Sequence, residues 1–117
     1  MSYTKGFGKL ERGVWSNDRL PADVRIARIQ FKQQIRTWLP QPPTEFENYQ
    51  NVLPQAGNGQ TYYEYQVGEA TAPTEEFPTL RGRRRLVALA DAGRNVLKMY
   101  FSDDHYAAGS WVELEHP

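Results

Sequence analysis

The sequence predicts an α+β fold in which one main helix packs on an antiparallel, four- to five-stranded meander. Residues 21–39 form the longest segment without a helix breaker, and their apolar side chains recur at helical spacing. From residue 61 onward, short runs with a two-residue period alternate with turn-forming residues. Because sequential strands usually lie side by side, a meander covered by the helix is the expected arrangement.

The helix prediction rests on an apolar stripe. Pro21 suits the first helical position, Asp23 places a negative charge in the first turn, and Pro40 prevents continuation. The stripe consists of Val24, Ala27, Phe31, Ile35 and Trp38. An alternative stays open, because residues 27–32 also alternate between apolar and polar as a strand does. If these residues are a strand, the fold becomes a small all-β barrel.

Two isoleucines lie off the predicted stripe. In a helix, Ile26 and Ile29 point away from the stripe and need cover from the N-terminal segment or another chain. We therefore take them as candidate residues for binding a partner protein or a second copy of the chain.

The N-terminal half contains weaker signals. Residues 1–8 are rich in glycine and expected to be loosely ordered, and residues 9–15 are a candidate first strand weakened by Gly13. Residues 44–47 match a capping box, which predicts a short helix ending near Leu53. A proline-bounded loop explains the same residues equally well.

The strands are expected at residues 61–67, 83–90, 96–102 and 111–115. Alternation places Tyr63 and Tyr65 on one face of the first run and Tyr62, Glu64 and Gln66 on the other. The second run is apolar on both faces, as in a central strand. Residues 91–95 form a tight connection in which Gly93 or Asn95 is expected to adopt a positive φ.

Composition excludes several classes of protein. The chain has 117 residues, suiting a single domain over residues 1–117, and its formal net charge is zero. Because it has no cysteine, disulfides, thiolate nucleophiles and cysteine-based metal sites are excluded. It shows neither a membrane-spanning apolar run nor a secretory signal, so a cytoplasmic protein without a membrane partner is expected. The alternative is a mature form whose secretory signal has been removed.

The sequence contains few of the motifs that identify catalytic sites. It has neither a G-x-S-x-G elbow nor a complete phosphate loop. Asp103, Asp104 and His105 could bind a divalent metal or act in acid–base chemistry, but aspartates after a strand are ordinary turn formers. We therefore expect no catalytic residue, metal or cofactor, and the sequence favours a protein that is not an enzyme.

Aromatic residues make up 13% of the chain, which is high for so small a core. Tyr62, Tyr100 and Trp111 fall on outward faces in the predicted strands, where such rings suit contact with a partner. If the assignment of the two faces is reversed, the same rings belong to the core instead. The leading hypothesis is a small non-catalytic interaction module that binds a protein partner, or itself, through this aromatic sheet face.

Two alternatives remain. Nucleic acid would be bound through the arginine-rich run of Arg81, Arg83, Arg84 and Arg85, with aromatic rings nearby to stack bases. The other alternative is a domain that binds a small ligand or catalyses a reaction in a pocket between helix and sheet.

Overall fold

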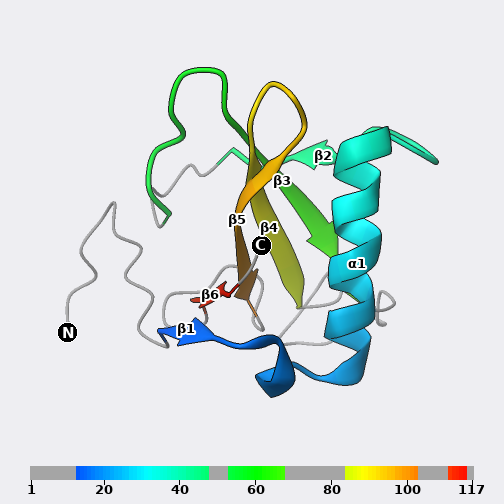
Figure 1. The fold of residues 1–117 in the computed structure, drawn as a ribbon, viewed down its shortest axis with the longest axis vertical. Coiled ribbons are helices and arrows are strands. Elements are labelled where there is room, and N and C mark those ends of the chain that lie inside the picture. Colours follow the sequence, from blue (N-terminus) through cyan, green and yellow to red (C-terminus); the bar gives the residue numbers. More distant parts are fainter. Residues whose placement is uncertain (1–12, 48–52, 68–83, 103–110, 116–117) are drawn as a thin grey trace, which may run out of the picture.

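A computed structural model describes residues 13–47, 53–67, 84–102 and 111–115. Within them, one α-helix packs on a mixed sheet of six strands (Figure 1). The predicted α+β class is confirmed and the all-β alternative is wrong. The strands are β1 (Val14–Trp15), β2 (Thr44–Glu45), β3 (Thr61–Gln66), β4 (Arg85–Ala90), β5 (Val96–Ser102) and β6 (Trp111–Leu114). The helix α1 spans Ala22–Thr37, and a 3₁₀ turn spans Asn17–Arg19.

The centre of the sheet is the predicted meander. Strands β3, β4, β5 and β6 pair antiparallel in chain order. A two-residue strand is added at each edge: β1 runs parallel to β6, and β2 runs antiparallel to β3. The sheet is therefore wider than the expected four or five strands, and it is mixed.

Helix α1 forms because its apolar stripe finds a sheet to cover. Val24, Phe31 and Ile35 are fully buried against the sheet, whereas Ile29 is 66% exposed. In a strand, Ile29 and Phe31 would lie on the same face and be buried together. Here Phe31 is buried and Ile29 is exposed, as a helix requires. The helix ends at Thr37, and the residue that caps it, Trp38, has a left-handed φ of 58°, two residues before Pro40. Among the described residues, no helix is long and apolar enough to cross a membrane.

Buried and paired arginines fix the helix to the sheet. Arg28 donates from Nη1 to the Asn17 Oδ1 at 3.0 Å and from Nη2 to the Glu115 carbonyl. Arg84, just before β4, donates to both carboxylate oxygens of Asp23, at 3.0 and 2.5 Å. Hydrogen bonding from Arg84 holds the pKa of Asp23 below its usual value. Arg84 is therefore directed to the helix side of the sheet.

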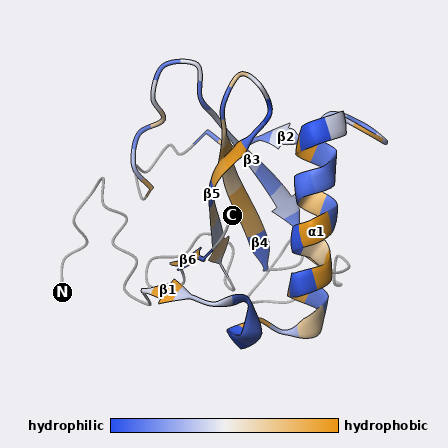
Figure 2. Ribbon diagram, viewed as in Figure 1, coloured by the Kyte–Doolittle hydropathy of each residue, from blue (hydrophilic) through white to orange (hydrophobic). Residues whose placement is uncertain are grey.

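Both faces of the sheet are covered. Beneath α1 lies the larger apolar cluster, to which β4 and β5 contribute heavily, as the hydropathy colouring shows (Figure 2). On the opposite face, a second cluster gathers around residues from the segment between β2 and β3. Its buried members are Leu53, Tyr62, Val87, Tyr100 and Trp111.

The predicted capping box is wrong. Thr44 and Glu45 are extended and pair with Glu64 and Tyr63, and the Phe46 backbone N–H donates to the Tyr62 carbonyl at 2.8 Å. Pairing with β3 satisfies the backbone donors that a helix cap would have satisfied. The rest of the expected helix, residues 48–52, lies outside the described residues.

The turn between β4 and β5 also differs from expectation. Its positive φ of 66° belongs to Arg94, not to Gly93 or Asn95. The Asp91 carboxylate accepts the backbone N–H groups of both Gly93 and Asn95 at 2.9 Å. This network folds the turn around Asp91, while the Arg94 guanidinium stacks 4.4 Å from the Trp38 ring centroid.

Candidate active site

The sheet face opposite α1 gathers polar side chains across its central strands. Two cross-strand rows define this polar face. One row joins Gln66, Arg85, Ser102 and Trp111, and the other joins Glu64, Val87, Tyr100 and Glu113. Because side chains alternate along a strand, the members of these rows lie on the face of the second apolar cluster. Carboxylate, amide, guanidinium and hydroxyl groups are thus assembled within a few residues of one another.

Glu64, which is half-buried on β3, places a carboxylate on the polar face, one row away from Arg85. It lies in register between Thr44 on β2 and Val87 on β4. Arg85 is its diagonal neighbour on β4, about 7–8 Å away between the backbones, within reach of two long side chains. The other carboxylate of this face, Glu113, accepts at its Oε2 a hydrogen bond from the Lys98 Nζ at 2.9 Å. A carboxylate that can accept a proton and a guanidinium that can bind an anion therefore lie on neighbouring strands of the same face.

Arg85 places a positive charge in a fully buried position. Its side chain has no exposed surface, and its Nη1 donates to the Arg84 carbonyl at 2.9 Å. A guanidinium stays protonated at all ordinary pH values, and its interaction with an anion is strengthened where water is excluded. The two neighbouring arginines therefore lie on opposite faces of the sheet. Arg84 pairs with Asp23 of the helix, and Arg85 lies on the polar face.

Two phenols lie beside this pair. Tyr62 donates from its hydroxyl to the Pro54 carbonyl at 2.6 Å, and its ring centroid is 6.4 Å from that of Tyr100. Burial raises the pKa of Tyr62 to about 12 and also raises that of Tyr100. Both phenols consequently stay protonated at neutral pH, so neither acts as a base there.

The expected aromatic surface patch is not exposed. Tyr62, Tyr100 and Trp111 are 4%, 3% and 0% exposed. The alternation of the strands was assigned correctly, but Leu53 and Phe46 cover the face that was expected to be bare. These rings form a core, so the prediction that they make a partner-binding surface is wrong.

Replacing Trp111 by alanine is therefore expected to destabilise the fold. Removing a fully buried indole typically costs about 3–5 kcal/mol, through lost burial and the cavity left behind. Urea denaturation followed by circular dichroism measures this change. The exposed Val14, changed to alanine, is the control and should shift the midpoint little. Equal midpoints for the two variants would contradict the buried position of Trp111.

Other predicted residues have different outcomes. Ile26 and Ile29 are 57% and 66% exposed on α1, away from the apolar stripe as expected. Several candidates lie outside the described residues: Arg81, Arg83, Asp103, Asp104 and His105. In the part of the chain that the structure describes, no group of three histidine or acidic residues is arranged to hold a metal ion.

Sequence reasoning did not select Glu64, Gln66 or Ser102 as site residues. The available signal was Glu64 itself, a single acidic residue within a strand of tyrosines. A second signal was Arg85, which directly precedes the apolar residues of a central strand. Neither signal shows by itself that the two side chains share a face and lie diagonally.

Comparisons with known proteins agree with a catalytic site. Residues 10–112 match the ribonuclease family. A solved structure of ribonuclease Sa2 with mononucleotides is 26% identical, covers 88% of this chain and 93% of its own, and has a TM-score of 0.56. A structure of ribonuclease Sa2 with guanosine-2'-cyclophosphate is 27% identical, covers 88% and 96%, and has a TM-score of 0.54. A comparison with curated proteins gives no match.

These findings correct the leading hypothesis from the sequence. A non-catalytic interaction module, and the expectation that the chain is not an enzyme, are both overturned by a family match over most of the chain. The enzymatic alternative fits the polar face better than a protein-binding sheet surface does. The chain belongs to the ribonuclease family.

Proposed function

We propose that the chain cleaves RNA on the polar face, using the ribose 2'-hydroxyl next to the scissile phosphate as the nucleophile. The observation that carries the proposal is the diagonal placement of Glu64 and Arg85 on one sheet face. Membership of the ribonuclease family supports RNA as the substrate in preference to a protein partner.

Glu64 is the proposed general base. Its carboxylate takes the proton of the 2'-hydroxyl as the 2'-oxygen bonds to phosphorus. The bond from phosphorus to the 5'-oxygen of the next nucleotide then breaks. The products are a 2',3'-cyclic phosphate and a free 5'-hydroxyl. A positioned carboxylate in this role typically accelerates a reaction by about 10²–10⁴-fold.

Arg85 is proposed to hold the phosphate. As the 2'-oxygen attacks, negative charge builds on the non-bridging phosphate oxygens. The planar guanidinium can donate two hydrogen bonds to such oxygens. Its burial fixes the donor in place beforehand, which favours the transition state over the ground state.

The departing 5'-oxygen needs a proton, and we propose His105 as its source. A histidine suits this role because its ordinary pKa lies near neutrality. His105 lies outside the described residues, so the assignment rests on the sequence. It follows Ser102, on the polar face, by three residues, a reach of at most about 11 Å.

We also propose that the chain binds guanosine nucleotides. Ribonuclease Sa2, which is similar over most of this chain, has been solved with guanosine-2'-cyclophosphate. The base would be held beside the phosphate site, where the polar face meets the second apolar cluster.

Incubation of the purified chain with a single-stranded RNA that contains one guanosine tests this function. We expect cleavage after guanosine and a product ending in a 2',3'-cyclic phosphate, identified by mass spectrometry. The matched control is the same oligonucleotide with a 2'-O-methyl group on that guanosine, which removes the nucleophile and should stay intact. Cleavage of both oligonucleotides at the same site would refute attack by the 2'-hydroxyl.

A further inference from the structure

The outer face of α1 lies on the side of the molecule away from the polar face, because α1 covers the other side of the sheet (Figure 1). Ile26 and Ile29 are 57% and 66% exposed there. A depression of about 420 Å³ borders this face, and its described lining is Ile29, Lys32, Gln33, Arg36 and Thr37. Nothing in the proposed RNA chemistry uses these residues.

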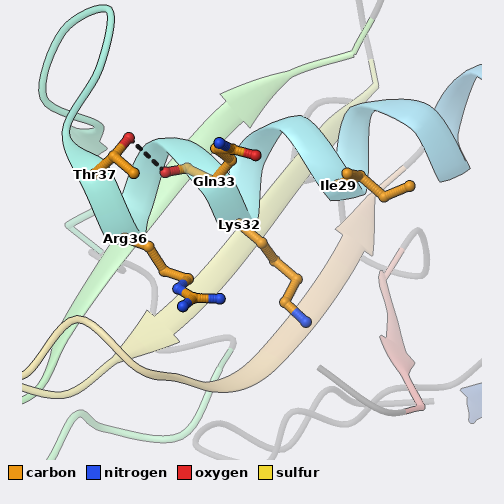
Figure 3. A pocket seen from close by; sticks show the side chains of 5 residues that line it. All are labelled: Ile29, Lys32, Gln33, Arg36 and Thr37. Carbon is orange, nitrogen blue, oxygen red and sulfur yellow. Dashed lines mark hydrogen bonds between the residues drawn. The ribbon is translucent and has the colours of Figure 1, made fainter.

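The depression combines an apolar side chain with two cations. Ile29, Lys32 and Arg36 follow one another at three- and four-residue steps, which places them on one side of the helix. Figure 3 shows Lys32 and Arg36 projecting to the same side of α1. Thr37 donates to the Gln33 carbonyl at 2.9 Å, so its hydroxyl is turned back on the helix.

The charge of this face is not balanced within α1. Besides Lys32 and Arg36, the helix contains Arg25 and the buried Arg28. Asp23 is its one acidic residue, and that carboxylate is held by Arg84. Among the residues that the structure describes, neither Lys32 nor Arg36 has an ion-pair partner. A bound partner that carries carboxylates would supply the negative charges that pair with Lys32 and Arg36.

We propose that the outer face of α1 is a docking surface for an acidic segment of another protein. The segment would insert an apolar side chain against Ile29 and present carboxylates to Lys32 and Arg36. A guanidinium accepts a carboxylate in a bidentate geometry, and a central apolar anchor excludes water from the ion pairs around it.

Charge favours this occupant over a second copy of the chain. Two outer faces packed against each other would bring cations of α1 opposite cations of its twin, which disfavours association. A depression that one side chain can enter also suits a protein segment better than a flat bilayer surface. The proposal does not depend on the RNA-cleaving activity.

A synthetic helical peptide is the probe, with one leucine flanked by glutamates at positions i−4 and i+3. It is titrated into the isotopically labelled full chain at low salt, and backbone amide shifts are followed by NMR. We expect saturable shifts that centre on Ile29, Lys32 and Arg36. Lys32→Glu and Ile29→Ser should each weaken binding about tenfold, which corresponds to 1.4 kcal/mol.

Two controls establish whether binding is specific to the outer face of α1. Arg19→Glu reverses one charge elsewhere and should leave the affinity unchanged; a peptide with glutamine in place of glutamate should not bind. RNA cleavage by Lys32→Glu should be normal. The proposal is overturned if Lys32→Glu binds the peptide as well as the unchanged chain does. It is also overturned if phosphatidylserine vesicles, but not the peptide, bind this face, or if Ile29→Ser dissociates a dimer.

Discussion

Replacing Glu64 by glutamine is expected to lower the rate of RNA cleavage by about 10²–10⁴-fold while the fold is retained. Glutamine has nearly the same shape and keeps a hydrogen-bonding carbonyl, but it cannot accept the proton of the 2'-hydroxyl. Glu64 is half-buried in the middle of β3, in register with both β2 and β4, so the substituted side chain should occupy the same place. Single-turnover cleavage of a guanosine-containing oligonucleotide measures the loss directly, free of product release.

Glu45→Gln is the matched control for this substitution. Glu45 lies on β2, is exposed, and pairs with Tyr63 of β3. Because Tyr63 alternates with Tyr62 and Glu64, this pair lies on the face opposite to the polar face. Glu45 has the same side chain in the same sheet but lies off the polar face. Cleavage should therefore continue at the rate of the unchanged chain. A Glu64→Gln variant that is folded by circular dichroism and cleaves as fast as Glu45→Gln would remove Glu64 from the mechanism.

Periodicity predicted the large elements because each has a face to bury over several residues. The stripe through Val24 and Phe31 predicted α1, and alternation predicted β3 to β6, with Met99 and Val112 buried beneath the helix. Two-residue edge strands have no such period. Strand β2 exists because Thr44 and Glu45 find backbone partners on β3, and this pairing outweighs a local capping signal.

The second covered face could not be predicted from alternation. Tyr100 was correctly placed opposite Phe101, but alternation does not show what covers each face. Leu53 and Phe46, distant in sequence from Tyr100, cover it. A run of aromatic residues on the second face therefore resembled a binding surface until a tertiary contact showed that it is core.

The candidate site depends on strand register, which the sequence leaves open. Glu64 and Arg85 are diagonal neighbours only because Gln66 pairs with Arg85. A tight two-residue turn would fix such a register from the sequence, but β3 and β4 are joined by residues 67–84. With one residue of slip, Arg85 would face the helix and Arg84 the polar face. The separation of the two arginines is thus a property of the folded sheet.

Replacing Arg85 by lysine is expected to lower kcat by about 10²–10³-fold, with a smaller change in KM. Lysine keeps the positive charge but lacks the planar pair of donors that fits the phosphate oxygens as charge builds on them. Arg84→Lys is the control, because Arg84 is adjacent in sequence but faces α1 and pairs with Asp23. That variant should keep kcat and lose some thermal stability, because it weakens the bidentate pair. Steady-state cleavage assays and thermal unfolding of both variants measure these effects. If Arg84→Lys lost kcat while Arg85→Lys kept it, the phosphate would have to be bound on the helix side of the sheet.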